Sequence, residues 1–446
     1  MKFNDKDTKQ PDKIELSLKL ADEFCANNKD LIFCVDNETF YLWSDNYYQL
    51  RKDKQVKLYL IHNEAYAYLS VNGFKNFMNN IAVLSQVNLS DFNSYEIMDF
   101  CNGVLDIKTG VFNGHDRKYL STTRIPYNYD QKADCPVWHG FLQTALEGDM
   151  ERISVLQEFM GYCLGRDNSF HRALVLIGEG RNGKGTTFHV INRMLGKANC
   201  SALKLGEMNR QESVSQLVGK LVNIDADTDT SASGFESDFR RISAGDAIMA
   251  RELYNNPFMF TPYCKLIIGA NDLPRIADKT HGFYDRLIII PYNVSFVGRE
   301  DLQLKDKLDA EIAGILNWAL EGRKRLYERG RFEIAKTLDD YVVDLKRENN
   351  PVDLYIYENI GFHDDAKTSK REVYEHYHQW AKESGHQPCS KIKFGKEFFR
   401  LCKSKISKDE REDGMERTPI WTNVFIKGKF DPSLNTGKGD QVRWDE

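Results

Sequence analysis

The feature that most constrains this chain is a glycine-rich loop between an apolar run and a helical segment. The run Ala173–Ile177 has the composition of a buried strand, and a helix is expected over 188–195. Between them, Gly178, Gly183 and Lys184 meet the spacing G-x-x-x-x-G-K. Such a loop curls its backbone N–H groups around phosphates, while the helix N-terminus adds positive potential. The residues expected to contact the nucleotide are Gly178, Glu179, Gly180, Arg181, Asn182, Gly183, Lys184, Gly185 and Thr186.

The same glycines also satisfy G-x-G-x-x-G, the dinucleotide-binding pattern. That alternative expects an acidic residue at the end of a second strand about 20 residues further on. Residues 201–204 contain no acid and show no strand pattern, and the dinucleotide pattern does not require Lys184. The sequence therefore favours a nucleoside triphosphate, ATP, over a dinucleotide or an ordinary glycine turn.

Polar residues that follow later apolar runs complete a candidate ATP site. Asp225 and Asp227 follow a buried run at 221–224, and acids in this position manage Mg²⁺ and the attacking water. The sequence does not choose between them. Gly185 stands where Ser or Thr normally ligates Mg²⁺, so Thr186 becomes the candidate hydroxyl ligand. Asn271, after a third run, could hold the water, and Arg286, before a fourth, could reach a phosphate.

Composition excludes several classes of protein. The chain has 446 residues and a net charge of −5, so any binding of nucleic acid must use local patches. Nine scattered cysteines without C-x-x-C spacing favour reduced thiols over disulfides or a zinc site. No apolar run approaches the roughly 18 residues that a membrane helix needs, so we expect no membrane partner and a cytoplasmic location.

The length predicts several domains. We expect a small α+β accessory domain at 1–95, in which 55–60 looks like a strand. Strands, turns and helices follow at 96–170. Strands separated by helices predict an α/β core with a mostly parallel sheet at 171–300. A helical segment at 301–362 and a terminal domain at 363–446 complete the chain.

Two regions are candidates for binding DNA. Residues 247–263 have the pattern of a hairpin with Asn255 and Asn256 at its tip, and Arg251 and Tyr254 lie beside it. The terminal domain contains a helix, a turn, a basic helix and an apparent strand pair, which suggests a winged helix-turn-helix. Its basic helix presents Lys391, Lys393, Lys396 and Arg400. An ordinary solvated lysine face is the alternative.

Several passages together resemble the superfamily 3 helicases, within them the primase-helicases of phages, plasmids and poxviruses. They include NGVLDIKTG at 102–110, LQEFMGYCLG at 156–165, GEGRNGKGT at 178–186, KLIIGANDLPR at 265–275 and GFYDRLIIIPY at 282–292. The C-terminal passages VYEHYHQWAKESG and KIKFGKEF are similar to the terminal winged-helix module of that family.

The resemblance implies an AAA+-like ATPase that assembles as a hexameric ring around single- or double-stranded DNA during replication of a phage or mobile element, in the host cytoplasm if a phage encodes it. It makes Asn271 the sensor, Arg286 the finger that reaches the neighbouring subunit's γ-phosphate, and the hairpin the DNA-gripping loop. Relatives often carry a lysine in that hairpin; here Arg240, Arg241 or Arg251 would replace it. Residues 1–95 lack a catalytic set, so we expect no primase activity in this chain. A primase or other replication proteins are candidate partners.

Two functions of other classes stay open from the sequence. One is an origin-binding initiator that uses ATP only as a switch. The other is a nucleotide kinase or metabolic ATPase.

Overall fold

The chain divides into two units, Met1–Asp339 and Asp340–Glu446. The computed structural model describes residues 13–62, 69–93, 96–229, 232–251, 256–271, 281–406 and 419–429. The helical segment predicted at 301–362 is shared between the two units, because Ile312–Arg329 packs in the core of the first and Pro351–Asn359 in that of the second. The five predicted domain limits stay predictions.

A five-stranded parallel sheet forms the centre of the first unit. Its order is β14-β8-β13-β10-β9, and every neighbouring pair is parallel. The strands are β8 (Ala173–Ile177), β9 (Cys200–Ser201), β10 (Val222–Asp225), β13 (Lys265–Ala270) and β14 (Leu287–Pro291). The three longest are almost wholly buried, as strands covered on both faces must be, which explains their continuous apolar runs. The predicted mostly parallel sheet is confirmed. The expectation of no strand near 201 was wrong, because the two-residue strand β9 is too short to leave a pattern.

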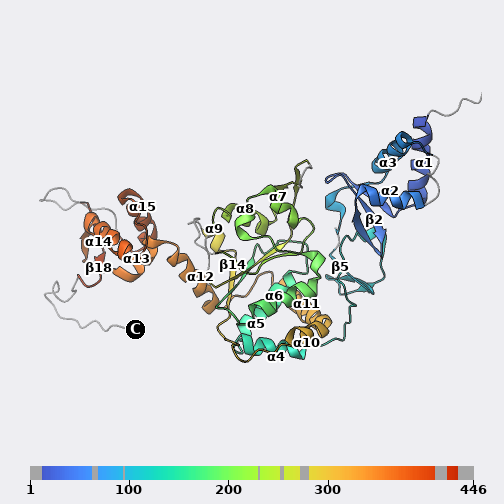
Figure 1. The fold of residues 1–446 in the computed structure, drawn as a ribbon. Coiled ribbons are helices and arrows are strands. Elements are labelled where there is room, and N and C mark those ends of the chain that lie inside the picture. Colours follow the sequence, from blue (N-terminus) through green and yellow to red (C-terminus); the bar gives the residue numbers. More distant parts are fainter. Residues whose placement is uncertain are drawn as a thin grey trace, which may run out of the picture. The chain divides into compact units, whose positions relative to one another are not determined.

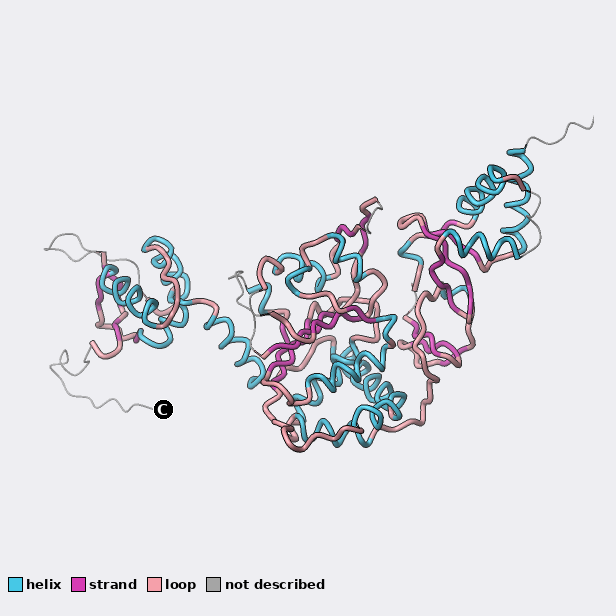
Figure 2. Tube along the Cα trace, viewed as in Figure 1, coloured by secondary structure: helices cyan, strands magenta, loops and turns pink. Residues whose placement is uncertain are grey.

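Helices cover both faces of this sheet (Figures 1 and 2). On one side lie α4 (Pro136–Ala145), α5 (Met150–Tyr162), α6 (Lys184–Leu195), α10 (Leu304–Ala310) and α11 (Ile312–Arg329). On the other lie α7 (Gln211–Val214) and α8 (Glu236–Ala244), and the short α9 (His281–Tyr284) precedes β14. This three-layer arrangement is the α/β core that the sequence predicted.

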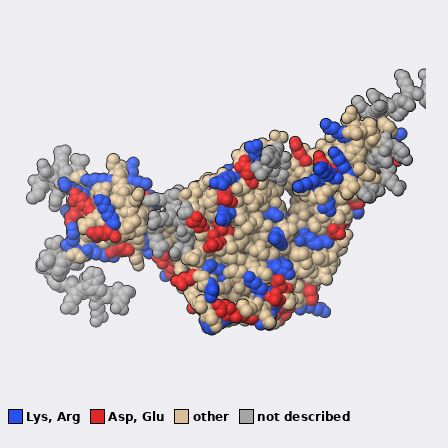
Figure 3. Space-filling view, in the orientation of Figure 1, with Lys and Arg blue, Asp and Glu red and all other residues tan. Residues whose placement is uncertain are grey.

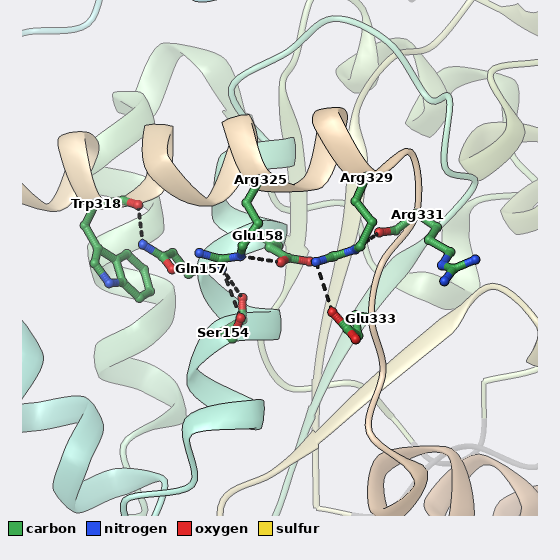
Figure 4. A network of polar contacts seen from close by, with 8 residues as sticks. All are labelled: Ser154, Gln157, Glu158, Trp318, Arg325, Arg329, Arg331 and Glu333. Carbon is green, nitrogen blue, oxygen red and sulfur yellow. Dashed lines mark hydrogen bonds and ion pairs between the residues drawn. The ribbon is translucent and has the colours of Figure 1, made fainter.

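Helices α5 and α11 are joined by an ionic network around one buried carboxylate (Figure 4). Glu158 on α5 is 1% exposed and lies between Arg325 and Arg329 of α11; the Arg325 Nε–Oε1 distance is 2.8 Å. The helices approach so closely that a Cβ on Gly161 would lie 2.4 Å from the Ala319 carbonyl oxygen. Because a buried carboxylate needs compensating charge, the two arginines fix this helix pair behind the sheet.

The N-terminal part of the first unit is α+β. Strands β1 (Leu31–Cys34), β2 (Thr39–Ser44), β3 (Tyr47–Arg51) and β4 (Gln86–Val87) form one sheet, with α1 (Lys13–Asn27), α2 (Asp53–His62) and α3 (Val71–Leu84). The predicted strand at 55–60 was wrong: it lies in α2, where Val56 and Leu60 are buried one helical turn apart. A second sheet follows, of β5 (Ile97–Phe100), β6 (Gly103–Asp106) and β7 (Phe112–Asn113).

The second unit begins within α12 (Lys336–Glu348) and has its own aromatic core around Tyr355, Tyr377 and Phe394. Its helices are α13 (Pro351–Asn359), α14 (Lys370–Glu383) and α15 (Lys391–Cys402), and its strands are β15 (Ile360–Gly361), β16 (Lys367–Ser369), β17 (Ile420–Thr422) and β18 (Phe425–Ile426). Ser369 and Ser390 cap α14 and α15 with their side chains, as their place before each helical pattern predicts. Strands β17 and β18 pair with β16 and β15, which precede α14, rather than with each other.

In the described part of the chain, no helix combines the length and apolarity needed to cross a bilayer.

Candidate nucleotide site

The glycine-rich loop leaves β8 and enters α6 through three left-handed backbone positions. Gly178, Arg181 and Gly183 have φ of 145°, 58° and 103°. At Gly178 a Cβ would also lie 2.3 Å from the carbonyl oxygen of Tyr292, so no larger residue fits. Helix α6 begins at Lys184, four residues before the predicted start, because the loop delivers its backbone directly into helical geometry. The lysine therefore occupies the first position of the helix, where N–H groups point outward.

Lys184 folds back over its own loop. Its ammonium donates to the carbonyl oxygens of Gly178 and Glu179, the latter at 3.0 Å, and only 7% of the residue is exposed. Burial lowers the pKa of Lys184, and the negative charge of Asp227 partly opposes this. An ammonium held by two neutral carbonyls is poorly compensated, which favours its transfer to an anionic group.

The structure separates the two candidate acids. The Asp225 carboxylate is buried and accepts a hydrogen bond from the Leu205 backbone N–H at 2.8 Å, on the β9 side of β10. Asp227 is exposed, and its charge acts on Lys184. The backbone N–H of Thr228 donates to Gly269 at 2.9 Å, which holds this turn beside the end of β13. Of the two, Asp227 is the exposed acid whose charge reaches Lys184, and Asp225 orders the turn after β9.

Two hydroxyls lie in the first turn of α6 and have different environments. Thr187 is fully buried and shares a hydrogen bond of 2.9 Å with the phenol of Tyr292. Thr186 is only half-buried. Since Thr187 is committed to the protein interior, Thr186 is the hydroxyl that a metal ion at this loop could use.

Asn271 follows the end of β13 next to the loop. Ala270 is in register with Ile177, and the backbone N–H of Gly178 donates to Ala270 at 3.2 Å. Asn271 is exposed at this point. The structure thus brings Lys184, Asp227 and Asn271 to the carboxyl edge of the sheet, as predicted for parallel strands.

Arg286 does not join this set. It precedes β14, and its backbone carbonyl accepts a hydrogen bond from Ala173 at the start of β8. Because β14 and β8 are parallel, with Leu287 opposite Ala173, Arg286 lies at the amino edge of the sheet, about 20 Å from Gly178 at 3.3 Å per residue. The Arg286 guanidinium donates to the Gly282 carbonyl, and its Nε is buried with no partner among the described residues. This arginine cannot reach the phosphates of its own loop.

The predicted hairpin is present as β11 (Ile248–Ala250) and β12 (Phe258–Phe260). Arg251 and Asn256 are exposed beside it, whereas Tyr254 and Asn255 lie outside the described residues. Arg241 pairs with Asp238 and donates to Ala247, so its charge is partly compensated. Sequence reasoning missed that Met249 and Met259, directly opposite each other, are 45% and 51% exposed. The described base of the hairpin is therefore apolar on its open face.

Helix α15 presents its predicted basic residues unequally. Lys391, Lys393 and Lys396 are exposed. Arg400 makes two hydrogen bonds to the Glu397 carboxylate, at 2.7 and 3.0 Å, which raises its pKa and reduces the positive charge it offers to a partner. Over the drawn face of each unit, basic and acidic side chains are interspersed, in keeping with the small net charge (Figure 3).

Three family models match separate parts of the chain. The "D5 N terminal like" family matches residues 19–147, the "Poxvirus D5 protein-like" family residues 340–436, and a family of unknown function (DUF5906) residues 176–286, which include the phosphate loop. The predicted resemblance to primase-helicases of the poxvirus type is confirmed by the first two models.

Two viral proteins are similar over part of their length. "Putative helicase L207/L206" of Acanthamoeba polyphaga mimivirus is 27% identical over 228 residues, which are 49% of this chain and 24% of that protein. "Putative helicase 121R" of Invertebrate iridescent virus 3 is 23% identical over 328 residues, 62% of this chain and 34% of that protein. This chain thus spans about a third or less of each.

Solved structures of the C-terminal region of NrS-1 share the fold. One has a TM-score of 0.57 at 9% identity, and the match covers 92% of this chain and 100% of that one. A second has a TM-score of 0.55 at 10% identity, with 94% and 100% covered. At this identity the likeness concerns the fold alone.

Proposed function

We propose that this chain, a D5-like protein of the primase-helicase type, is an ATP-dependent DNA helicase that acts in replication. The observation that carries the proposal is the convergence of Lys184, Asp227 and Asn271 on one edge of a parallel sheet, beside a phosphate loop. The names of its viral relatives support a helicase rather than another ATPase.

The chemistry at this edge would be ATP hydrolysis with Mg²⁺. The loop N–H groups and Lys184 would bind the phosphates. Mg²⁺ typically takes one or two carboxylates together with phosphate oxygens and water, so the exposed Asp227 and the half-buried Thr186 suit it, directly or through water. When bound, the ion would neutralise charge on the transferring phosphoryl group. Asn271 would orient the attacking water.

The place of Arg286 supports a ring. An arginine finger stabilises the transition state at the γ-phosphate, but Arg286 lies about 20 Å from its own loop by the strand register. It would therefore serve the ATP of a neighbouring subunit. We propose an AAA+-like core that assembles as a homo-hexamer of the superfamily 3 kind, with one nucleotide at each interface.

DNA would be held by two surfaces. The hairpin β11–β12 would grip the strand in the channel through Arg251 and Asn256. Arg241, which donates to Ala247 beside β11, and Arg240 on the same helix are further candidates. The second unit would bind DNA as a winged-helix domain, with α15 as its basic helix. Contacts to the phosphate backbone would make this binding indifferent to sequence.

A strand-displacement assay on forked DNA tests the proposal. Protein with ATP and Mg²⁺ should separate the strands, and Lys184→Ala or omission of ATP should abolish separation. A footprint at one DNA site without strand separation would instead favour the origin-binding initiator. ATPase activity of a monomer that DNA does not change would favour the nucleotide kinase or metabolic ATPase.

A further inference from the structure

The segment that follows β14, residues 292–296, lies against the phosphate loop and is hydrogen-bonded to it. Tyr292 continues the β8–β14 ladder, its N–H donating to Ile177 at 2.8 Å. Four residues later the N–H of Phe296 donates to the carbonyl of Arg181 at 2.9 Å. This second bond holds the loop at Arg181, whose backbone is left-handed, a conformation that is unfavourable for residues other than glycine. Residues 292–296 thus support the loop from outside its own sequence.

Asn182 connects this segment to the start of helix α6. The residue is 5% exposed, and its Nδ2 donates to the Tyr292 carbonyl at 2.9 Å. Its Oδ1 accepts a hydrogen bond of 3.3 Å from the backbone N–H of Lys184. Only a short side chain with both a donor and an acceptor makes these two contacts, and asparagine has both.

Tyr292 holds the loop at a third point. Its ring is almost fully buried, and its phenol forms a hydrogen bond of 2.9 Å with the Thr187 hydroxyl. Burial raises the pKa of Tyr292, so the phenol stays protonated and can keep this bond at all ordinary pH values. Thr187 Oγ1 is also 3.4 Å from the carbonyl of Gly183. The contacts of Tyr292 therefore lie on both sides of Lys184.

We propose that Asn182 and Tyr292 are positioning residues that fix the phosphate loop, and through it Lys184, in the geometry that hydrolysis requires. Neither residue needs to touch the nucleotide. The inference rests on the proposed ATPase function, and its physical basis is that small displacements of a binding loop reduce turnover strongly. The assignment is specific: the amide of Asn182 and the phenol of Tyr292 act through Tyr292 O, Lys184 N and Thr187 Oγ1.

The test uses substitutions that remove single hydrogen bonds from the full-length chain. Tyr292→Phe and Thr187→Val delete the same bond from its two ends, with little change in shape, and Thr187→Val also loses the contact with the Gly183 carbonyl. Each should lower kcat about 2- to 10-fold, as expected for one neutral hydrogen bond, with KM nearly unchanged. The double variant should be no slower than Thr187→Val, because the bond between the two hydroxyls is already absent in that single variant. Thr187→Ser, which keeps the hydroxyl, should restore kcat.

Asn182 is tested in two steps. Asn182→Ala loses both bonds. Asn182→Asp keeps the acceptor for the Lys184 N–H but places a buried, uncompensated carboxylate against the Tyr292 carbonyl. We expect kcat to fall by about 10- to 100-fold in Asn182→Ala, and by at least as much in Asn182→Asp, because its buried charge has no partner. The matched control is Asn192→Ala on the same helix, which removes a bond to Phe188 away from the loop and should leave kcat unchanged.

Thermal unfolding and the affinity for a non-hydrolysable ATP analogue are measured in parallel. If Tyr292→Phe, Thr187→Val and Asn182→Ala lower the melting temperature but leave kcat at the wild-type value, the inference is overturned while the ATPase stands. If the wild-type protein neither binds nor hydrolyses ATP, the proposed function fails and takes the inference with it.

Discussion

Two buried lysines, Lys184 and Lys265, lie at opposite edges of the central sheet, and each donates to two backbone carbonyls. The Lys184 ammonium is held by the carbonyl oxygens of Gly178 and Glu179, and that of Lys265 by those of Gly165 and Tyr263, at 2.5 and 3.0 Å. Burial lowers the pKa of both lysines, that of Lys265 to about 8. Local chemistry alone does not tell which of them could serve a nucleotide.

The difference lies in what surrounds each ammonium. Lys265 is 1% exposed and enclosed, with its Nζ 4.6 Å from the centre of the Tyr162 ring and Asp167 among its charged neighbours. Lys184 belongs to a loop whose neighbours Glu179, Gly180 and Gly185 are exposed. A lysine on a loop can exchange its carbonyl partners for an anion, whereas one at the start of a central strand cannot. We therefore assign Lys184 to chemistry and Lys265 to the core.

The largest expected effect comes from substituting the two lysines separately, which tests the assignment directly. Lys184→Ala should abolish ATP hydrolysis with the fold intact, because preorganised charge at a phosphoryl group is worth at least about 10²-fold in rate. Lys265→Met, of similar length, should keep hydrolysis. Turnover of ATP and circular dichroism of both variants check this. Normal turnover in a well-folded Lys184→Ala protein would contradict the proposed site.

Arg286→Ala should reduce hydrolysis by about 10³-fold or more, as for other arginine fingers, while ATP binding and ring assembly persist. The amino edge of the sheet would then contribute to chemistry after all, but in a neighbouring subunit. Single-turnover hydrolysis together with sizing of the assembly measures this.

Mixing Lys184→Ala with Arg286→Ala protein tests whether Arg286 acts between subunits. In mixed rings some interfaces pair an intact loop from one subunit with an intact Arg286 from the next. Hydrolysis should then exceed the sum of the two variants alone. If mixed rings form and no gain appears, Arg286 only supports the start of β14.

The lowered pKa of Lys265 predicts how the stability of the protein depends on pH. Its pKa is about 8 in the folded chain, against an ordinary value of 10.5, so between these values the unfolded state binds more protons. The free energy of unfolding should therefore rise with pH across this window, by at most about 3 kcal/mol. Lys265→Met should lack the rise. Urea unfolding of both proteins at pH 7 and pH 10 isolates the effect, since other titrating groups are shared, and equal pH dependence would contradict it.

Much of this site could be predicted because its signals are local. The loop, the apolar strands and the acid or amide after each strand are adjacent in sequence, and parallel strands bring their ends together. The choice between Asp225 and Asp227 could not be made from the sequence. It depends on the backbone N–H of Leu205, which lies 20 residues earlier in the chain and donates to the Asp225 carboxylate.

Other features depend on contacts across longer distances. Asn182 and Tyr292 are 110 residues apart, and nothing in GEGRNGKGT indicates the partner of the asparagine. The position of Arg286 on the far edge follows only from the register of β14 against β8. The strand expected at 55–60 was wrong because a short apolar run does not distinguish the period of a strand from that of a helix.

The smallest expected effect concerns the exposed lysines on α15, in contrast to the buried Lys184 and Lys265. Substituting Lys391, Lys393 and Lys396 together by Gln should weaken DNA binding and lower the slope of log K against log salt. The slope should fall by about 0.9 for each DNA phosphate that a lysine no longer neutralises, since released counterions set that slope. Arg400→Gln should change it less, because Glu397 already pairs with this arginine.

The charge-matched control substitutes the exposed Lys54, Lys57 and Lys75, far from α15 in sequence. Basal hydrolysis should survive in all of these proteins, because every nucleotide residue lies in the first unit. A salt slope equal to that of the control would make the α15 lysines an ordinary solvated face. It would also leave the exposed base of the hairpin as the remaining candidate surface for DNA.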